Sequence, residues 1–186
     1  MPQWGFANSL TICRLIAVPI YLFLFVTAHY RTALTVFMVA AFTDLVDGSI
    51  ARWFKETSSW GALVDPIADK LLMNSVFIGL AFAQVVPVWF AALILLRDGI
   101  IMGGLFYLHR RHISVAYQPL WVSKLSTLLQ MMTAAFGLVH ILSRHEPFLG
   151  YQEEMLQTAI LSTSVLVLLS GAAYMQQGWR ILRHRG

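Results

Sequence analysis

Closely spaced aspartates are the residues of this sequence that could do chemistry. Asp44 and Asp47 lie three residues apart, and Asp65 and Asp69 lie four apart, in a chain of 186 residues with nine acidic residues. Spacings of three and four place side chains on one face of a helix. Carboxylates without His or Cys select hard cations such as Mg²⁺, Mn²⁺ or Ca²⁺. Because Mg²⁺ leaves sites open for substrate phosphates, the pattern predicts phosphoryl transfer with two divalent ions.

The elements that must position these acids are expected to be membrane helices. Hydrophobic residues make up 58% of the chain and charged residues 12%, which leaves too little polar surface for a water-soluble globule. A helical span needs about 20 apolar residues. We therefore predict an all-α integral membrane bundle, with residues 1–186 forming a single catalytic domain. Its six transmembrane helices are expected near 6–28, 32–53, 61–84, 87–108, 120–143 and 156–177.

The basic residues predict the orientation of this bundle, because Lys and Arg favour the cytoplasmic side of a membrane. With both termini inside, the outer loops hold only Arg31 and Arg144. The inner segments hold Arg52, Lys55, Arg110, Arg111, Arg180, Arg183 and Arg185. The net charge of +4 indicates attraction to anionic lipids, and we expect no nucleic-acid partner. The expected location is the bacterial cytoplasmic membrane with the site facing the cytoplasm, with the mitochondrial inner membrane as the alternative.

The second and third spans should bring the four carboxylates together. The second span should end near Arg52 and the third should begin near Gly61, so the two form an antiparallel pair. Four crowded carboxylates repel one another unless positive charge lies between them. Small residues beside them, Gly48, Ala51 and Gly61, allow a bulky ligand or a neighbouring backbone to approach closely. The expected result is a pocket near the cytosolic interface.

Two explanations without catalysis also account for acids inside helices. Single aspartates can pair with nearby Lys or Arg for packing. A divalent-cation carrier would also place acids in helices, but it would need polar residues along a path to the outer face. Outside the motif, the second and third spans are apolar apart from Asn74, Ser75 and Gln84, and this favours a pocket that opens on one side.

The complete pattern is Asp44-x2-Asp47-Gly48-x2-Ala51-Arg52-x8-Gly61-x3-Asp65-x3-Asp69. It resembles the signature of the CDP-alcohol phosphatidyltransferase family and fills every fixed position of that signature. The resemblance extends from Asn8 to about Gln130. It implies a six-helix membrane bundle, usually a homodimer, with a polar cavity open to the cytosolic side.

The resemblance also implies roles for individual residues. Asp44, Asp47, Asp65 and Asp69 would hold two ions of Mg²⁺ or Mn²⁺, and Asp69 would also act as general base on the acceptor hydroxyl. The freed oxygen attacks the lipid-side phosphorus of a CDP-activated donor, and CMP leaves. The donor-binding residues implied in this way are Asn8, Thr11, Arg14, Gly48, Ala51, Arg52 and Gly61.

The acceptor is predicted from two further basic residues. Arg97 within the fourth span and Lys124 at the start of the fifth could both bind an acceptor phosphate. Alternatively, Arg97 pairs with Asp98 or Asp69, and Lys124 extends to the interface.

The segments 96–98, 106–111 and 123–127 resemble cardiolipin synthases of the mitochondrial type. The expected reaction therefore joins CDP-diacylglycerol to phosphatidylglycerol, giving cardiolipin and CMP. The alternative is phosphatidylglycerophosphate synthesis from glycerol 3-phosphate.

Overall fold

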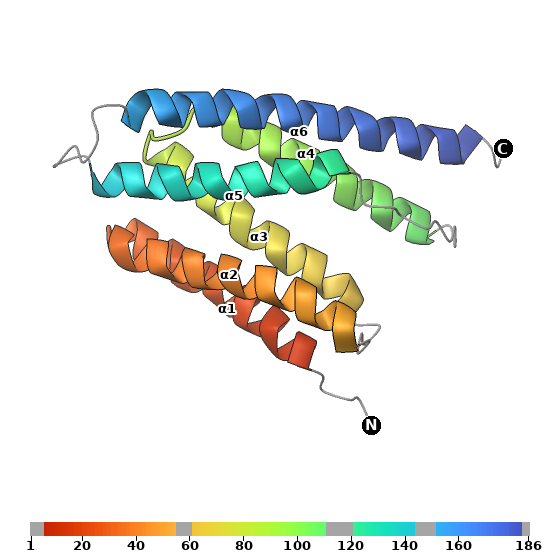
Figure 1. Ribbon diagram of the computed structural model, residues 1–186, viewed down its shortest axis with the longest axis horizontal. Coiled ribbons are helices and arrows are strands. Elements are labelled where there is room, and N and C mark those ends of the chain that lie inside the picture. The colour runs from red at the N-terminus through yellow and green to blue at the C-terminus, as the bar shows by residue number, and fades with distance from the viewer. Residues whose placement is uncertain (1–5, 55–60, 111–120, 144–151, 184–186) are drawn as a thin grey trace.

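The computed structural model describes residues 6–54, 61–110, 121–143 and 152–183. Within these segments, side chains are described except at residues 6–11, 14, 44–54, 61–69, 105, 108, 109, 152, 181 and 182. The described residues form six α-helices and no strand, as Figure 1 shows. They are α1 (Phe6–Val26), α2 (Tyr30–Phe54), α3 (Gly61–Phe82), α4 (Val88–Arg110), α5 (Trp121–Leu142) and α6 (Gln152–Arg183). The predicted all-α class is confirmed.

Two of the described helices are long and apolar enough to cross a membrane. They correspond to Trp121–Leu142 in α5 and Glu153–Arg180 in α6. Shorter apolar stretches occupy Leu15–Val26, Tyr30–Thr43 and Lys70–Phe82. Six membrane spans therefore stay a prediction. Helix α6 also extends beyond the apolar segment expected at 156–177, because acidic residues in its first turn and basic residues in its last turn complement the helix dipole.

Two tight turns make antiparallel hairpins of α1 with α2 and of α3 with α4. Ala28 has a left-handed backbone with φ of 59°, and the amide of His29 donates to the carbonyl of Leu24 at 2.8 Å. This is the Schellman arrangement that closes a helix C-terminus. Gln84, with φ of 57°, follows the end of α3 in the same way. Each hairpin is thus fixed by a local backbone contact.

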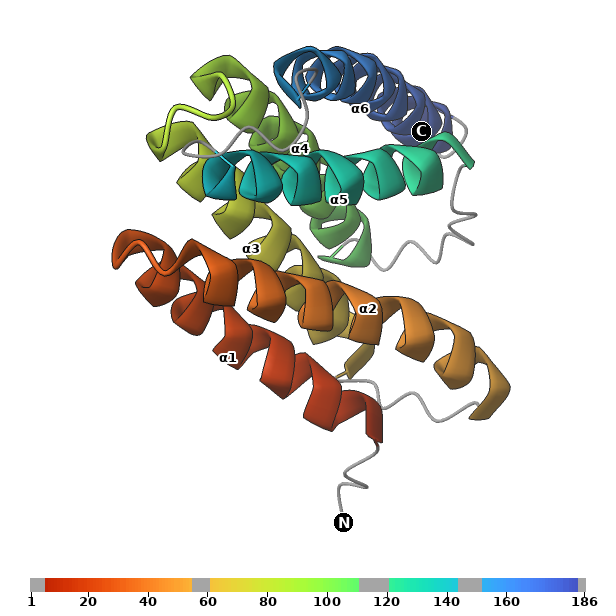
Figure 2. The ribbon, with the colours of Figure 1, turned by 60° about the vertical axis from the view of Figure 1, so that its left-hand side comes forward.

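The six helices divide into two groups that meet at α3. Helix α1 packs on both α2 and α3, whereas α6 packs on both α4 and α5. Helix α3 also contacts α4 and α5, and α2 contacts α5. Figures 1 and 2 show α3 passing between the α1 and α2 pair and the remaining helices. The third helix is therefore the main link between the two groups.

The apolar core is aromatic at the end of the bundle where α1 ends and α4 begins. The rings of Tyr21 and Phe25 lie 5.7 Å apart, and the Phe77 ring meets the Phe90 ring edge-on at 5.5 Å. Phe37 on α2 is also fully buried in this cluster. Edge-on and tilted rings pack favourably. This end of the molecule is filled by side chains.

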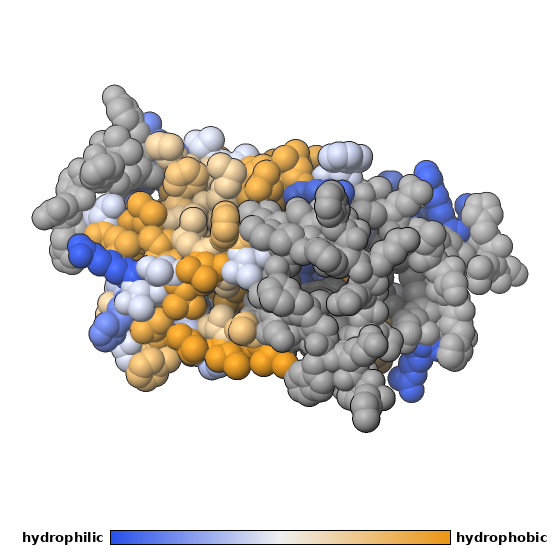
Figure 3. Space-filling model, turned by 60° about the horizontal axis from the view of Figure 1, so that its bottom comes forward, coloured by the Kyte–Doolittle hydropathy of each residue, from blue (hydrophilic) through white to orange (hydrophobic). Residues whose placement is uncertain are grey.

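The outer surface is also hydrophobic. Phe23 on α1 and Phe42 on α2 are each 67% exposed, and Leu161 on α6 is 63% exposed. Figure 3 shows hydrophobic side chains gathered over much of the visible described surface on one face. An apolar surface this extensive is typical of a protein that contacts an apolar phase.

Candidate active site

Helices α2 and α3 carry the four aspartates of the motif at one end of the bundle. Asp44 and Asp47 fall in the last three turns of α2, and Asp65 and Asp69 fall in the first three turns of α3. The described contacts join each of these helices to α1 rather than to each other, and Figure 1 shows the end of α2 and the beginning of α3 at the same end of the bundle. Both pairs of aspartates are therefore in helices, and the spacings of three and four place the two positions of each pair on one helix face.

The side chains of these four aspartates lie outside the described residues. Among the side chains that are described, no group of three or more His, Cys, Asp or Glu residues gathers at one place. Four carboxylates without a nitrogen or sulfur ligand match the oxygen preference of Mg²⁺ and Mn²⁺. The metal-binding roles stay predictions that are supported by this donor set.

The predicted donor-binding residues lie on the same helices or on their neighbour. Asn8, Thr11 and Arg14 belong to the first turns of α1, which packs against both α2 and α3. Gly48, Ala51 and Arg52 lie in the last turns of α2, and Gly61 is the first residue of α3. Their side chains lie outside the described residues, and their role in donor binding stays a prediction. The helix order nevertheless places all seven positions near the motif end of the bundle (Figure 1).

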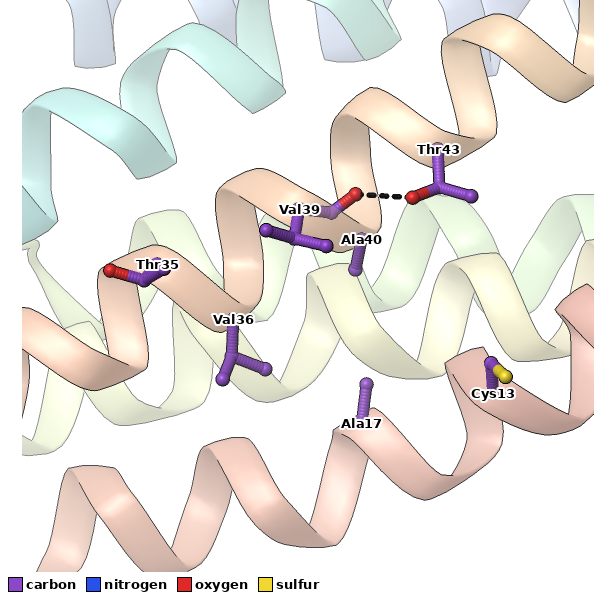
Figure 4. A pocket seen from close by; sticks show the side chains of 7 residues that line it. All are labelled: Cys13, Ala17, Thr35, Val36, Val39, Ala40 and Thr43. Carbon is purple, nitrogen blue, oxygen red and sulfur yellow. Dashed lines mark hydrogen bonds between the residues drawn. The ribbon is translucent and has the colours of Figure 1, made fainter.

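An apolar groove runs between α1 and α2 towards the motif. Its volume is about 260 Å³, and Figure 4 shows Ala17 and Ala40 facing each other across it. The Thr43 hydroxyl donates to the Val39 carbonyl at 2.6 Å, and Thr43 directly precedes Asp44. The lining residues are Cys13, Ala17, Thr35, Val36, Val39, Ala40 and Thr43.

No pattern in the sequence predicted this groove. Cys13, the one cysteine of the chain, is exposed there. The two facing alanines are the sequence signal that could have indicated the groove, since small residues leave space between neighbouring helices.

A buried charged cluster lies where α4, α5 and α6 meet. Arg97 and Asp98 on α4 are 4% and 2% exposed, and Arg97 Nη1 donates to Asp98 Oδ1 at 2.7 Å. Arg97 Nη2 donates to the hydroxyl of Ser123 on α5 at 2.8 Å and to that of Ser170 on α6 at 2.7 Å. The guanidinium therefore joins three helices. Buried charges of this kind are tolerated because they are paired and hydrogen-bonded.

Lys70 adds a fourth helix to this cluster. Its Nζ lies 3.2 Å from Asp98 Oδ1, the same oxygen that accepts from Arg97. Lys70 directly follows Asp69 in α3. Lys70, Arg97 and Asp98 together carry two positive charges and one negative charge. Arg97 Nε and Asp98 Oδ2 are buried and have no partner among the described residues.

The two residues predicted to bind the acceptor, Arg97 and Lys124, both have partners in the structure. Arg97 pairs with Asp98, which is one of the alternatives that the sequence left open. Lys124 is exposed at the start of α5 and lies 5.0 Å from the centre of the Trp121 ring, within the range of a cation–π contact. Arg97 bonds to Ser123, which directly precedes Lys124 in α5.

Residues 4–172 match the sequence model of the CDP-alcohol phosphatidyltransferase family. The chain belongs to this family. The match includes the whole motif from Asp44 to Asp69, as well as Arg97 and Lys124. Membership in this transferase family therefore confirms the resemblance that the motif indicated.

Several curated relatives carry names from phospholipid synthesis. "Cardiolipin synthase (CMP-forming)" of Homo sapiens is 30% identical over 151 residues, which cover 73% of this chain and 50% of that protein. The protein of the same name in Rattus norvegicus is 28% identical over 192 residues, covering 94% and 62%. "Probable phosphatidylglycerophosphate synthase" of Mycobacterium tuberculosis is 33% identical over 181 residues, covering 94% and 81%. The chain thus spans between half and two thirds of the length of the two mammalian relatives.

Proposed function

We propose that this CDP-alcohol phosphatidyltransferase is a phospholipid-synthesising membrane enzyme that joins CDP-diacylglycerol to phosphatidylglycerol. The products are cardiolipin and CMP. The observation that carries the proposal is the complete set of motif aspartates, which fall in the last turns of α2 and the first turns of α3. Similarity to the human and rat proteins named cardiolipin synthase favours phosphatidylglycerol as the acceptor.

The four aspartates supply the chemistry in this proposal. Asp44, Asp47, Asp65 and Asp69 would hold the Mg²⁺ or Mn²⁺ ions, whose charge would stabilise the negative charge that develops on the transferring phosphoryl group. Asp69 removes the proton from the acceptor hydroxyl as that oxygen bonds to the lipid-side phosphorus. The bond from this phosphorus to the oxygen of CMP breaks, and CMP leaves with the electron pair.

The groove between α1 and α2 supports a lipid donor. Its wall is mostly apolar, and it ends at Thr43, one residue before the first aspartate of the motif. We place one acyl chain of CDP-diacylglycerol in this groove. The nucleotide end would then lie towards Asn8, Thr11 and Arg14 of α1 and the small residues of the motif.

The acceptor assignment has one competitor. The relative of Mycobacterium tuberculosis is named a probable phosphatidylglycerophosphate synthase, which favours glycerol 3-phosphate as the alternative acceptor. Either acceptor presents a phosphate that Arg97 or Lys124 would bind. A large lipid acceptor needs a lateral apolar opening, whereas a soluble acceptor needs a compact basic pocket.

We further propose that the chain forms one domain of six membrane spans, with the motif on the cytoplasmic or matrix side, and works as a homodimer. Basic residues at the described helix ends support this orientation. Arg110 and Arg180 lie near the motif end of the bundle, whereas Arg31 lies near the opposite end (Figure 1).

A carrier for divalent cations is disfavoured by the described core. The family contains transferases, and the end of the bundle opposite the motif is filled by Tyr21, Phe25, Phe77 and Phe90. A polar path from the aspartates to that end would have to pass this aromatic packing.

The test is an assay of the purified protein with CDP-diacylglycerol and either Mg²⁺ or Mn²⁺. Phosphatidylglycerol and glycerol 3-phosphate are offered separately, and CMP and lipid products are measured beside an Asp69→Asn variant. Cardiolipin formed with phosphatidylglycerol alone supports the proposal. Phosphatidylglycerophosphate would move the assignment to the alternative. Absence of CMP release that depends on Asp69, with these and other alcohol acceptors, would overturn the transferase proposal.

A further inference from the structure

Lys70 carries a positive charge one residue after Asp69, the residue proposed as general base. It lies in α3, and its ammonium is a compact charge on a flexible four-carbon stem. An ammonium in that position can pair with a motif carboxylate and so compete with a divalent ion for it. The ammonium is instead bound to Asp98 of α4, at 3.2 Å.

We propose that Asp98 is a positioning residue that keeps the Lys70 ammonium bound to α4 and away from the metal-binding carboxylates. The inference rests on the proposed function, since it assumes that the motif aspartates hold divalent ions. It assigns Asp98 a task distinct from substrate binding, because Asp98 acts through Lys70. The task requires a carboxylate that is itself held firmly in place.

The surroundings of Asp98 meet this requirement. The carboxylate is 2% exposed, and its Oδ1 accepts from Arg97 Nη1 at 2.7 Å. Arg97 is in turn held by Ser123 of α5 and Ser170 of α6. The orientation of the carboxylate is therefore fixed from two further helices before Lys70 reaches it.

The contacts make Lys70 the less firmly held of the two cations in the cluster. One carboxylate faces two cations, and Arg97 keeps two hydroxyl partners if that carboxylate is lost. Lys70 is 19% exposed, compared with 4% for Arg97, and it contacts the cluster through Asp98. Loss of the Asp98 charge would therefore free the Lys70 ammonium, and Lys70 follows Asp69 by one residue and Asp65 by five in α3.

If the cluster had only a structural role, the stability and the metal affinity of its variants would change in a different way. If Asp98 only holds helices together, its loss lowers stability whether or not Lys70 is present. If Asp98 restrains Lys70, its loss weakens metal binding only while Lys70 keeps its charge. The two roles are separated by combining Asp98→Asn with Lys70→Met. The double variant has the same net cluster charge as the natural protein but leaves Arg97 without its carboxylate.

The experiment measures Mn²⁺ affinity of the purified full-length protein in detergent, without lipid substrate, by electron paramagnetic resonance of free Mn²⁺. Asp98→Asn is expected to weaken binding by about tenfold, the scale found for partners that orient metal ligands. Lys70→Met should bind close to the natural affinity, and the double variant should regain that affinity. Thermal unfolding is followed in parallel. Ser162→Ala, at an exposed position of α6, is the matched control.

Either of two results would overturn the inference. They are an unchanged Mn²⁺ affinity in Asp98→Asn, or an equal loss in Asp98→Asn and in the double variant. If Asp98→Asn does not fold, Ser170→Ala with and without Lys70→Met replaces it, because this change loosens Arg97 without removing a charge. A loss that disappears with Lys70→Met supports the role of Asp98, whereas no loss or a persistent loss contradicts it.

Failure of the proposed function gives a different result. A natural protein that does not bind Mn²⁺, or that releases CMP independently of Asp69, would contradict the proposed function itself. Normal Mn²⁺ binding and Asp69-dependent CMP release, with no effect of Asp98→Asn, would contradict only the positioning role.

Discussion

Helices α1 to α3 and helices α4 to α6 are packed by different means. In the first group, the Phe25 ring lies against Gly79 of α3 and beside Tyr21. In the second group, Arg97 bonds to Ser170, and Thr133 of α5 bonds to Thr163 of α6 at 2.9 Å. Apolar contacts fill space, whereas buried hydrogen bonds also specify which residues must meet. Hydrogen bonds in the second group therefore fix which residues of α4, α5 and α6 face one another. The ion pair of Lys70 with Asp98 joins α3, the helix that carries Asp65 and Asp69, to this group.

The largest effect is expected from a substitution that lowers catalytic activity without lowering stability. Asp69→Asn removes the proposed base and one metal ligand, so CMP release should fall by about 10²- to 10⁴-fold. Thermal stability should stay close to that of the natural protein, because the neighbouring carboxylates lose a repelling charge. CMP release and thermal unfolding are measured on the same preparation. An activity above one tenth of the natural value would contradict the role of Asp69.

The next prediction compares a buried polar group from each helix group. Arg97→Met leaves Asp98 buried with Lys70 as its remaining ionic partner, and breaking a buried pair costs about 3 kcal/mol. Tyr21→Phe removes a buried hydroxyl that has no partner among the described residues, so its effect should be below about 1 kcal/mol or stabilising. Unfolding in detergent mixtures measures both. Equal losses would show that the two groups do not differ as described.

A smaller effect is expected where the two groups touch. A Cβ added at Gly137 of α5 would lie 2.8 Å from Leu80 Cδ1 of α3, so Gly137→Ala should destabilise by about 1 to 2 kcal/mol. The matched control is Gly103→Ala on α4, where an added Cβ meets nothing within 4 Å. That control should be neutral or slightly stabilising. No difference between the two variants would mean that Leu80 simply moves aside.

The smallest effect should come from one hydrogen bond in the second group. Thr133→Val removes the contact to Thr163, and comparable bonds between membrane helices contribute about 0.6 kcal/mol. A double-mutant cycle with Thr163→Val isolates the coupling free energy between the two hydroxyls. A coupling near zero would weaken the view that hydrogen bonds specify the packing of α5 on α6.

Local patterns in the sequence predicted most of the helices. The third span was expected at 61–84 and α3 runs over Gly61–Phe82, because the polar segment 55–59 precedes it and Pro87 follows it. The bounds of α6 were missed at both ends, because Glu153 and Arg183 belong to the helix although they are not apolar. Hydropathy reports apolar length, and charged residues that favour helix ends extend the helix beyond it.

The motif and the charged cluster differ in how far sequence could predict them. The aspartates were found because their spacing is local and their chemistry is distinctive. The sequence left Arg97 with either Asp98 or Asp69 as a partner, and it gave no indication that Lys70 would join them. The contacts to Asp98 and Ser170 depend on how α3, α4 and α6 pack, and no local pattern encodes that packing.

The length of α6 has a consequence for the lipid environment. Its 32 residues make a rod about 48 Å long, whereas the hydrocarbon layer of a bilayer is about 30 Å thick. In a membrane the helix must tilt or project, and Arg183, whose guanidinium lies 5.9 Å from the Trp179 ring, suits the headgroup layer. Ser170 on the same helix accepts a hydrogen bond from Arg97. A change in bilayer thickness that tilts α6 would therefore change the depth at which the charged cluster lies in the membrane. Because Lys70 joins this cluster to α3, the depth of the aspartates would change with it.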